Sequence, residues 1–592
     1  MKRIILKERS IDPASTNYIE DYLINVGVKP DQVQYFVNTD RFVPRWDGVI
    51  GDNPFTLPNI EEAAKVYIDA LNNKKKIFVQ VDSDTDGFTS SAILYNYTKK
   101  FYPDADISYR LHEGKQHGII IDTIPEGTQV VVIPDAGSMQ VEELTILSQM
   151  GITVIVLDHH EYDELTVIPD VYIVNSQSLL FPNHSLSGAG VVFMFVKVLD
   201  KLLNQNYSDY FCDLAALGII SDVMDSRMLG NHIIINQGLH AIRNKMFREL
   251  LTKQSYKISD PTNPTKIDIA FYVTPLINGL IRSGSQEEKE TFFKAMLEQQ
   301  SDEMFESTTR NGLRTETIWQ MAARLAANAK SRQDNAKKKM IEALKKKIDA
   351  EGLSNHKILA VPLTEKESAT INPNIVGLAA MDICKFYNRP TIITRYNKSE
   401  DGSVHYMGSG RSDKYEGFYS FKEFLESTNK CDYVEGHANA FGVSVSAENY
   451  PALVKYADDN LDINYDDNVI EVDYYFKGII NSALLAAFAS ASNLWGNQID
   501  EPKFAFDLDI KSDEVNVMGK DLTTFKFRRG TTDFIMFGAG ETIKQLQSRP
   551  ISSVTLVGRT SLNEWNGRTN VQIIIEDIVV KEQKISILRD LI

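Results

Sequence analysis

Short apolar runs alternate with helical patterns between about residues 60 and 240. Three of these runs predict buried strands, namely "KIFVQVD", "TQVVVIPD" and "ITVIVLDHH". Around them, apolar residues recur at helical spacing in "IEEAAKVYIDALNNKKK", "SSAILYNYTKKFY" and "MQVEELTILSQMG". Short strands separated by helices are typical of a parallel sheet that is covered on both faces. We therefore expect an α/β domain over residues 46–240.

The pattern changes three times after this domain. Residues 241–350 are mainly helical in pattern and predict a connector, and residues 351–455 predict a second α/β unit with apolar runs such as "KILAVPL". The acidic stretch "DDNLDINYDDNVIEVD" marks the next boundary. Residues 456–592 then carry strand-like runs punctuated by Gly and Asn, which are typical of a small β-barrel. Residues 1–45 form an N-terminal segment.

Composition and charge narrow the class of protein. A chain of 592 residues is too long for one core, so several domains are expected. The net charge of -17 argues against a generic polyanion binder, and any nucleic-acid site must be a local basic groove. The 3 cysteines are widely spaced and indicate neither a disulfide framework nor a zinc knuckle. The sequence shows neither a membrane-length apolar run nor a signal peptide, so we expect a cytoplasmic protein.

Acidic residues end each of the three predicted strands, at Asp82, Asp135 and Asp158. Ligands of open parallel sheets bind beyond the carboxyl ends of the strands, so these acids predict one site. In "DSDTDG", Asp82, Asp84 and Asp86 stand at alternate positions, where three ionised carboxylates would repel one another strongly unless a cation lies between them. A calcium loop is disfavoured, because its twelfth position would be Ile93.

Two histidines, His159 and His160, follow Asp158 directly. Carboxylate oxygens mixed with imidazole suit Mn²⁺ or another first-row ion better than Ca²⁺. A further apolar run, "LAALGIISD", ends at Asp222, which provides enough ligands for two ions. Two ions held by shared carboxylates activate a water and stabilise the leaving oxygen of a phosphate ester.

A basic stretch stands out in this acidic chain. Nine Lys or Arg lie between Arg324 and Lys347, against two acids. A solvated connector helix explains most of these charges. The alternative is one wall of a groove that follows nucleic-acid phosphates.

The motifs "DSDTDG", "PDAGS", "DHH" and "GIISD", in this order, resemble those of the DHH phosphoesterase superfamily. "MGSGRS" and "EGHANAFG" resemble the associated DHHA1 domain, and "LNEWNGRTNVQIIIEDI" resembles the end of the oligonucleotide-binding (OB) barrel of RecJ exonucleases. "LSGAGVVF", "PLINGLIR" and "NPNIVGLAA" also lie where RecJ-like proteins carry related segments. The resemblance covers nearly the whole chain. It implies a DHH parallel-sheet domain, a DHHA1 domain and a C-terminal OB-like barrel.

The resemblance also implies roles for individual residues. Those that match the metal ligands are Asp84, Asp86, Asp135, His159 and Asp222. His160 matches a histidine that contacts the scissile phosphate or the metal, Asp82 is an extra acid typical of RecJ-like sequences, and Asp158 then orients a ligand. The positions that match residues holding the strand are Gly408, Ser409, Gly410, Arg411, Ser412 and His437. We expect the two glycines to let backbone amides approach phosphate, and Arg411 to offer a bidentate fork.

Two features depart from the family pattern. Glu435 precedes Gly436 where RecJ-like proteins usually have a second glycine, and a histidine usual near "NPNIVG" is missing. An acid beside the phosphate-binding histidine could weaken strand affinity.

Aromatic and basic residues of the predicted barrel offer stacking faces and cations for a single strand. These residues are Phe525, Phe527, Arg528, Arg529, Trp565 and Arg568. Trp565, in a turn rich in Gly and Asn, is the one we expect to be exposed.

The residues together with the resemblance favour an exonuclease that depends on Mn²⁺ or Mg²⁺, with two ions, and the resemblance implies that it degrades single-stranded DNA in the 5′-to-3′ direction during repair, recombination or replication. The polarity comes from the resemblance alone. One alternative is a DHH phosphodiesterase of short oligonucleotides or cyclic dinucleotides, and another is a non-catalytic nucleic-acid-binding subunit. We expect the protein to be a monomer, and to be either a bacterial protein or a viral protein in a bacterial host. Its expected partner is a single-strand-binding protein or a helicase.

Overall fold

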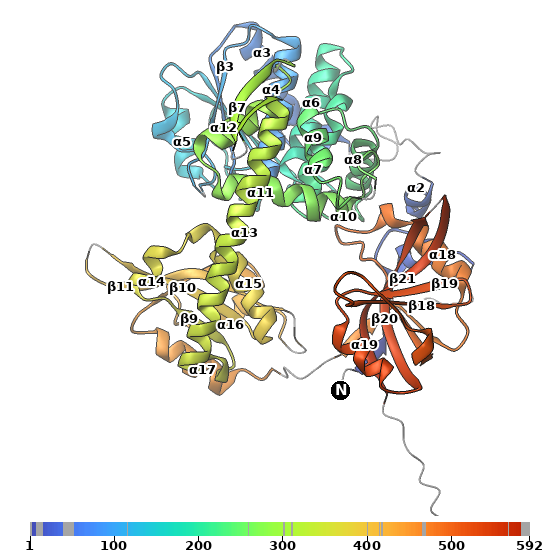
Figure 1. Ribbon diagram of the computed structural model, residues 1–592. Coiled ribbons are helices and arrows are strands. Elements are labelled where there is room, and N and C mark those ends of the chain that lie inside the picture. The colour runs from blue at the N-terminus through green and yellow to red at the C-terminus, as the bar shows by residue number, and fades with distance from the viewer. Residues whose placement is uncertain are drawn as a thin grey trace, which may run out of the picture.

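The computed structural model describes residues 3–7, 16–38, 53–114, 116–258, 260–299, 302–309, 312–399, 401–413, 415, 418–463, 469–565 and 567–581. The expected α/β domain, helical connector, second α/β unit and C-terminal β unit are all present (Figure 1). Within these described ranges, no helix is both long and apolar enough to cross a lipid bilayer.

The first α/β domain is built on a five-stranded, fully parallel sheet of order β3-β2-β4-β5-β6. Its strands are β2 (Ile77–Val81), β3 (Ile107–Leu111), β4 (Val130–Pro134), β5 (Thr153–Asp158) and β6 (Val171–Asn175). β2, β4 and β5 are buried almost throughout, because helices cover both faces of the sheet. The three strands expected from the sequence are therefore neighbours in the sheet.

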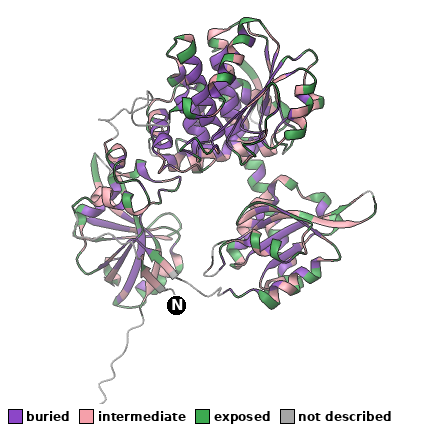
Figure 2. Cartoon of the chain, turned by 180° about the vertical axis from the view of Figure 1, so that it is seen from behind, coloured by how far each residue is buried: buried purple, intermediate pink, exposed green. Residues whose placement is uncertain are grey.

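The helices of this domain include α3 (Ile60–Asn72), α4 (Thr85–Phe101), α5 (Val141–Gln149), α6 (Gly188–Leu203), α7 (Cys212–Ser221), α8 (Leu229–His240) and α9 (Lys245–Lys253). The apolar residues of α3, α4, α6 and α7 join those of β2 and β4 in one large core. Figure 2 shows the buried residues concentrated in these helices and strands.

The connector contains α11 (Thr274–Ser283), α12 (Gln286–Met296) and the 34-residue helix α13 (Ile318–Glu351). α13 runs from the first α/β domain into the second (Figure 1). Unlike the helical expectation, residues 304–317 form a hairpin of β7 (Met304–Thr309) and β8 (Gly312–Thr317).

The basic residues of α13 are mostly paired. Arg332 contacts Glu288 at 2.7 Å, Lys337 contacts Asp382 at 2.9 Å, and Lys345 stacks on the ring of Phe386. Other pairs are Arg324 with Glu316, Lys330 with Asp334, and Lys347 with Glu351 and Glu367. This pairing supports the connector interpretation rather than a phosphate groove.

The second α/β unit has a five-stranded sheet of order β12-β13-β11-β10-β9. Its strands are β9 (Leu359–Pro362), β10 (Thr391–Lys398), β11 (Val404–Arg411), β12 (Tyr433–His437) and β13 (Ala440–Ser446). Its helices include α15 (Val376–Tyr387), α16 (Phe421–Ser427) and α17 (Tyr450–Asn460).

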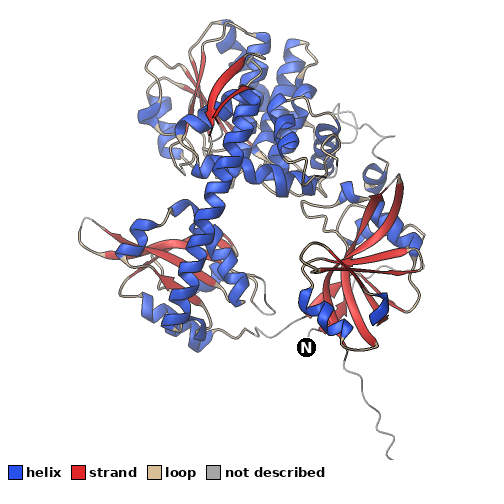
Figure 3. Ribbon diagram, in the orientation of Figure 1, coloured by secondary structure: helices blue, strands red, loops and turns tan. Residues whose placement is uncertain are grey.

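The C-terminal unit is a curved seven-stranded sheet of order β15-β16-β20-β21-β19-β18-β17 (Figure 3). Its strands are β15 (Tyr474–Lys477), β16 (Phe504–Lys511), β17 (Asn516–Met518), β18 (Thr524–Arg529), β19 (Thr532–Met536), β20 (Ile551–Trp565) and β21 (Arg568–Val580). The helices α18 (Ser482–Ser490) and α19 (Gly540–Gln547) pack against it. We call this unit the barrel domain.

The N-terminal segment packs on the barrel domain, which the sequence did not indicate. β1 (Arg3–Leu6) pairs in parallel with β14 (Val469–Val472), and residues of α1 (Tyr18–Asn25) and α2 (Val33–Val37) enter the core of the barrel domain. Leu229 and Ile233 of α8 belong to the same core. The barrel domain and the first α/β domain therefore share apolar surface, and the sequence-based domain boundaries stay predictions.

Candidate metal centre and strand-binding face

Three carboxylates gather at the carboxyl edge of the first sheet. Asp82 follows β2, Asp135 follows β4, and Asp158 ends β5, on three adjacent strands. All three side chains are buried. The strand order thus brings together acids that are up to 76 residues apart in the chain.

Helix α4 presents two more acids to this edge. Asp84 caps the helix, because its Oδ1 accepts a hydrogen bond from the Gly87 amide at 2.9 Å, and Asp86 lies in the first turn. A Cβ at Gly87 would lie 2.7 Å from both the Cβ and the carbonyl oxygen of Asp82. Glycine is therefore required for the helix to begin so close to β2.

The N-terminus of α6 holds Asp86 in place. Its Oδ1 accepts hydrogen bonds from Ser187 Oγ at 2.9 Å and the Ala189 amide at 3.0 Å, and its Oδ2 accepts one from the Gly188 amide at 2.7 Å. This arrangement places a carboxylate at the positive end of a 16-residue helix. A Cβ at Gly188 would lie 2.3 Å from Asp135 Oδ1, so this helix can approach the acids only with glycine there.

His159 joins two groups of possible ligands. Its Nε2 lies 3.2 Å from Asp135 Oδ1, 3.6 Å from Asp222 Oδ2 and 3.9 Å from Asp86 Oδ2. One group of metal-compatible atoms comprises Asp86, His159 and Asp222, and another comprises Asp82, Asp84 and Asp135. A third group, of Asp135, Asp158, His159 and His160, shares one residue with each of these two, so the groups are adjacent, as a pair of ions with a shared ligand would require.

The acids cannot all be ionised without a cation. Burial and then the charges of Asp86 and Asp84 raise the pKa of Asp135 well above its usual value. The same causes raise the pKa of Asp222 to about 8. Asp135 Oδ1 is also buried without a hydrogen-bond donor. Several carboxylates with one imidazole fit Mn²⁺ or Mg²⁺, so the residues present suit the expected ions.

The carboxylate of Asp158 contacts His160, and its two oxygens are not both directed at the other acids. Asp158 Oδ1 accepts hydrogen bonds from the His159 amide at 2.7 Å and lies 2.8 Å from His160 Nδ1, while its Oδ2 accepts one from the Ser138 amide at 3.1 Å. The hydrogen bond to Asp158 raises the pKa of His160 to about 9. Since His160 is largely exposed, its other ring nitrogen can reach a bound substrate.

Sequence reasoning missed two histidines beside Asp82. His117 Nδ1 lies 2.8 Å from Asp82 Oδ2, and the Gly118 amide donates to Asp82 Oδ1 at 3.1 Å. His112 follows β3, and its Nε2 lies 3.9 Å from Asp82 Oδ1. Both could have been found from "RLHEGKQHG", which begins with the last two residues of β3, a strand that ends at the same edge of the sheet.

The segment "MGSGRS" is largely a strand, not a loop. β11 lies between β10 and β13, so its backbone amides face neighbouring strands, and amide contacts to phosphate by Gly408 and Gly410 are not available. A Cβ at Gly408 would lie 1.9 Å from Ile393 O, and one at Gly410 would lie 2.2 Å from the Phe441 ring. These glycines allow close packing, which corrects the role expected from the sequence.

Side chains on one face of this sheet fit the strand-binding expectation better. Arg411 pairs with Ala440, which pairs with His437, and opposed residues point to the same face. Ser409 lies two residues before Arg411, and Glu435 lies two residues before His437, so both are on the same face. Each of them pairs with Gly442 of β13, which lies between them. Ser412 differs, because it is buried and its hydroxyl donates to Asp413 O at 2.7 Å. We call Ser409, Arg411 and His437, whose contact with a strand stays a prediction, the strand-binding face.

Helix α11 connects this face to the acids, through two residues that sequence reasoning missed. Asn278 Oδ1 accepts hydrogen bonds from the Thr85 hydroxyl at 2.9 Å and the Thr85 amide at 3.2 Å, between Asp84 and Asp86. Arg282 lies one helical turn further, on the same side of α11. Burial and the charge of Arg282 lower the pKa of Arg411, so the two cations lie near each other. "PLINGLIR" carries both residues, and the resemblance had already singled it out.

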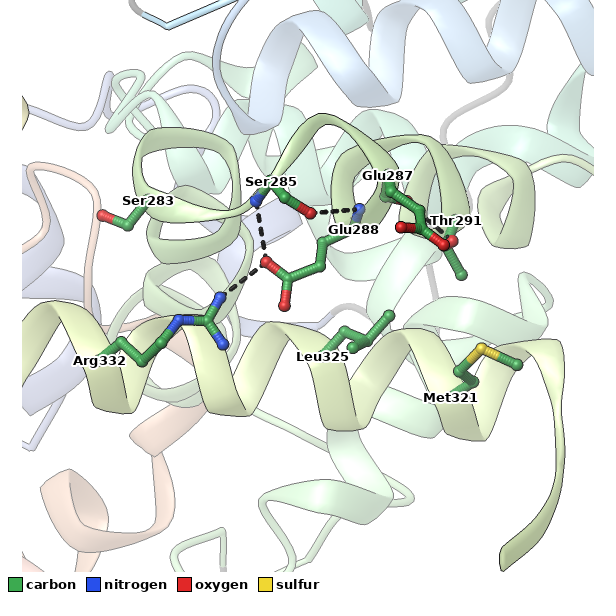
Figure 4. Close-up of a pocket in the computed structure, with 8 residues that line it drawn as sticks. All are labelled: Ser283, Ser285, Glu287, Glu288, Thr291, Met321, Leu325 and Arg332. Atoms are coloured by element: carbon green, nitrogen blue, oxygen red, sulfur yellow. Dashed lines mark hydrogen bonds and ion pairs between the residues drawn. The ribbon is translucent and has the colours of Figure 1, made fainter. Parts of the chain in front are cut away.

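A groove of about 610 Å³ lies beside α12 and α13 (Figure 4). Its lining includes Met321, Leu325 and the pair of Glu288 with Arg332, while Ser285 caps α12 there. None of the candidate acids lines it. This groove is therefore separate from the candidate metal centre.

Several of the barrel residues that could offer stacking faces or cations, none of which was assigned individually, are buried or paired. Phe525 and Phe527 are buried in the core of the barrel domain, Arg528 is paired with Asp533 at 2.6 Å, and Arg529 with Glu514 at 2.7 Å. Arg568 is exposed. The side chain of Trp565 lies outside the described residues, so its expected exposure stays a prediction.

Known proteins resemble this chain along its whole length. Residues 76–219 match the DHH family, N-terminal domain, and residues 480–577 match the RecJ OB domain. A prophage-derived protein of Bacillus subtilis, YorK, named as a single-strand DNA-specific exonuclease, is 34% identical over 588 residues, which cover 97% of each chain.

Two further proteins, both named RecJ, are also similar to this chain. The single-stranded-DNA-specific exonuclease RecJ of Bacillus subtilis is 26% identical over 557 residues, covering 91% of this chain and 65% of that protein. The fold is similar to that of RecJ from Thermus thermophilus in complex with Mn²⁺, with a TM-score of 0.69, 22% identity, and coverage of 98% of this chain and 79% of the other.

Proposed function

The chain belongs to the RecJ family of single-strand-DNA-specific exonucleases, and we propose that it hydrolyses single-stranded DNA from the 5′ end with the help of two divalent cations. The observation that carries this proposal is the pair of adjacent ligand groups that meet at Asp135 and His159. The names of the relatives support the substrate, and the polarity is the part of the proposal that follows from the resemblance to RecJ exonucleases alone.

The chain's own residues divide the work at the metal centre. Asp84, Asp86, Asp135, His159 and Asp222 would hold two Mn²⁺ or Mg²⁺ ions. When bound, the ions supply a water that is nucleophilic at neutral pH and stabilise charge on the phosphate oxygens. Asp158 orients His160, whose exposed ring carries a positive charge when protonated and can contact the scissile phosphate.

The strand-binding face would position the phosphates next to the scissile one. Arg411 and Ser409 lie against Gly377 of α15, where a Cβ would come within 2.5 Å of Arg411 Nη2. Arg282 adds a second cation, and Asn278 on the same side of α11 contacts the start of the metal motif. Together these residues can hold one phosphate while its neighbour lies at the ions.

Two other functions are less well supported. A phosphodiesterase of short oligonucleotides needs no barrel domain, yet residues 480–577 match the RecJ OB domain. A non-catalytic subunit has no need of the acids, yet all of them are present and lie together. Monomeric action, a cytoplasmic location, and a single-strand-binding protein or helicase as partner remain proposals.

One assay tests the proposed function. Single strands, duplexes and dinucleotides carrying a label at either end would be incubated with Mn²⁺, Mg²⁺ or a chelator. We expect metal-dependent release of short products from single strands, with a 5′ label lost at once and a 3′ label retained on shortening strands. Preferential hydrolysis of dinucleotides, or no hydrolysis of any substrate, would contradict the proposal.

The metal centre should make thermal stability depend on pH. In the metal-free protein, the raised pKa of Asp222 gives stability that is complete below its unfolded pKa near 3.8 and is lost as the pH rises to about 8. Bound Mn²⁺ replaces those protons, and at 100 times its Kd contributes about 2.7 kcal/mol. We expect the rise in Tm on adding Mn²⁺ to grow between pH 5.5 and 8, and a rise independent of pH would count against this assignment.

Glu435 should weaken strand binding. It is exposed and shares the face of Ser409, so its negative charge lies beside the proposed path of the backbone. Replacing Glu435 with Gln keeps the shape and removes the charge, and should tighten single-strand binding about twofold at low salt. Equal dissociation constants for both proteins at low and high salt would show that Glu435 does not face the substrate.

A further inference from the structure

The turn that carries Asp222 ends helix α7 in an unusual way. Asp222 is the C-cap residue of α7. The Val223 amide donates to Ile220 O at 3.2 Å, and the Met224 amide donates to Ile219 O at 3.1 Å. This pattern of hydrogen bonds closes many helices, with glycine at the position that Val223 occupies.

Val223 is strained in this turn. Its φ is 56°, in the left-handed region, where a β-branched side chain collides with its own backbone. Val223 is 58% exposed, so packing around its side chain does not compensate. Such a conformation persists only where surrounding contacts hold it.

A side chain from the barrel domain supplies such contacts. Asn497 Nδ2 donates hydrogen bonds to Ile219 O and to Met224 O, both at 3.2 Å. These two carbonyls belong to the first and last residues of the turn, so a single amide spans it. Asn497 is itself buried and has a φ of 50°, which asparagine tolerates better than most residues.

The backbone around Asn497 is fixed to the same region. Asn497 O accepts hydrogen bonds from the Ser226 amide and the Ser226 hydroxyl, both at 2.9 Å. Lys266 Nζ donates to Leu494 O at 2.7 Å and to Ser226 Oγ at 2.9 Å. The neighbouring Trp495 is buried in the core of the barrel domain. The amide of Asn497 is thus held rigidly against the turn.

We propose that Asn497 is a positioning residue for Asp222, through which the barrel domain keeps one metal ligand correctly aimed. The proposal rests on the proposed role of Asp222 as a metal ligand. If Asn497 has this role, the metal centre depends on how the barrel domain packs against the turn after α7, because Asn497 is about 270 positions away from that turn in sequence.

The test uses the full-length protein and removes only the side-chain amide. Asn497→Gly keeps a residue that accepts positive φ, and Asn497→Asp keeps the shape but loses the donor. The matched control is Gln498→Gly, because Gln498 is the exposed neighbour with a φ of 74° in the same turn. Mn²⁺ binding is followed by the paramagnetic resonance of free Mn²⁺, and the turn by hydrogen exchange of residues 222–228 in metal-free protein.

We expect both Asn497 variants to bind one Mn²⁺ roughly 10- to 100-fold more weakly, which is the usual effect of losing a residue that orients a ligand. Exchange of the Met224 amide should accelerate, whereas Gln498→Gly should match the unmodified protein in both measurements. Adding Val223→Gly to Asn497→Gly should restore Mn²⁺ affinity, because a glycine turn needs no support.

Unchanged Mn²⁺ affinity in the Asn497 variants would overturn the proposal, whether or not exchange accelerates. Failure of the proposed function would look different, since the unmodified protein itself would then bind no Mn²⁺ or leave single strands intact. Loss of affinity without restoration by Val223→Gly would also contradict it, because the strained turn would then not be the cause.

Discussion

Replacing Asp135 with Asn is expected to reduce hydrolysis of single-stranded DNA roughly a thousandfold or more. Asp135 belongs to one ligand group and lies beside His159 of the other, with its Oδ1 3.2 Å from His159 Nε2 and without a hydrogen-bond donor. The substitution keeps the shape but removes the charge that two ions would share. Bound ions contribute several kcal/mol to transition-state stabilisation, and each 1.4 kcal/mol is about a tenfold change in rate.

Strand binding should survive this substitution, because the strand-binding face lies on the second sheet. The measurement is the single-turnover rate with Mn²⁺, together with the dissociation constant for a single strand. Because burial and the neighbouring acids raise the pKa of Asp135, removing its ionisable group should also leave Asp135→Asn at least as stable as the original protein without metal. Turnover within tenfold of the original would show that Asp135 is not a shared ligand.

Replacing Arg411 with Ala is expected to weaken single-strand binding about 10- to 100-fold. Hydrogen bonds to charged groups are worth about 1.5–3 kcal/mol. Arg411 is partly buried near Arg282, and the residues opposite it on the neighbouring strands are not acids. Removing one phosphate contact should also make the plot of log affinity against log salt shallower by about 0.7.

Two variants control this experiment. Arg411→Lys keeps the charge but loses the planar fork, and should recover only part of the affinity. Lys398→Ala removes an exposed cation at the far end of the same strand pair, where Lys398 faces Val404. If Lys398→Ala weakens binding as much as Arg411→Ala, the effect is one of net charge and the strand-binding face is wrongly placed.

The clustering of the candidate metal ligands could be predicted from the sequence because its signals are local. Asp82, Asp135 and Asp158 each end an apolar run, and parallel strands bring such ends to one edge. Asp222 follows a buried helix rather than a strand, yet its position was expected, since the motif "GIISD" carries it. For predicting that Asp222 joins the other acids, the order of the motifs was more informative than whether a helix or a strand precedes it.

Other features depend on contacts between distant segments, which no local pattern reports. The pairing of β1 with β14 joins residues that are 466 positions apart, and Asn497 reaches Ile219 across 278 positions. "GSGRS" has the composition of a loop, but Gly408 and Gly410 are needed inside β11, where neighbouring groups leave no space for a Cβ. Most aromatic residues in strands belong to a core, but the sequence alone did not assign Phe525 and Phe527 individually, and the fold shows that both are core.

The most direct test of two-ion hydrolysis at this centre is to count bound Mn²⁺ while measuring single-turnover cleavage of a 5′-labelled single strand. The two groups of ligands predict that the original protein binds two Mn²⁺ and that cleavage appears only as the second ion binds. Full cleavage with one bound ion, or in the presence of a chelator, would contradict the account.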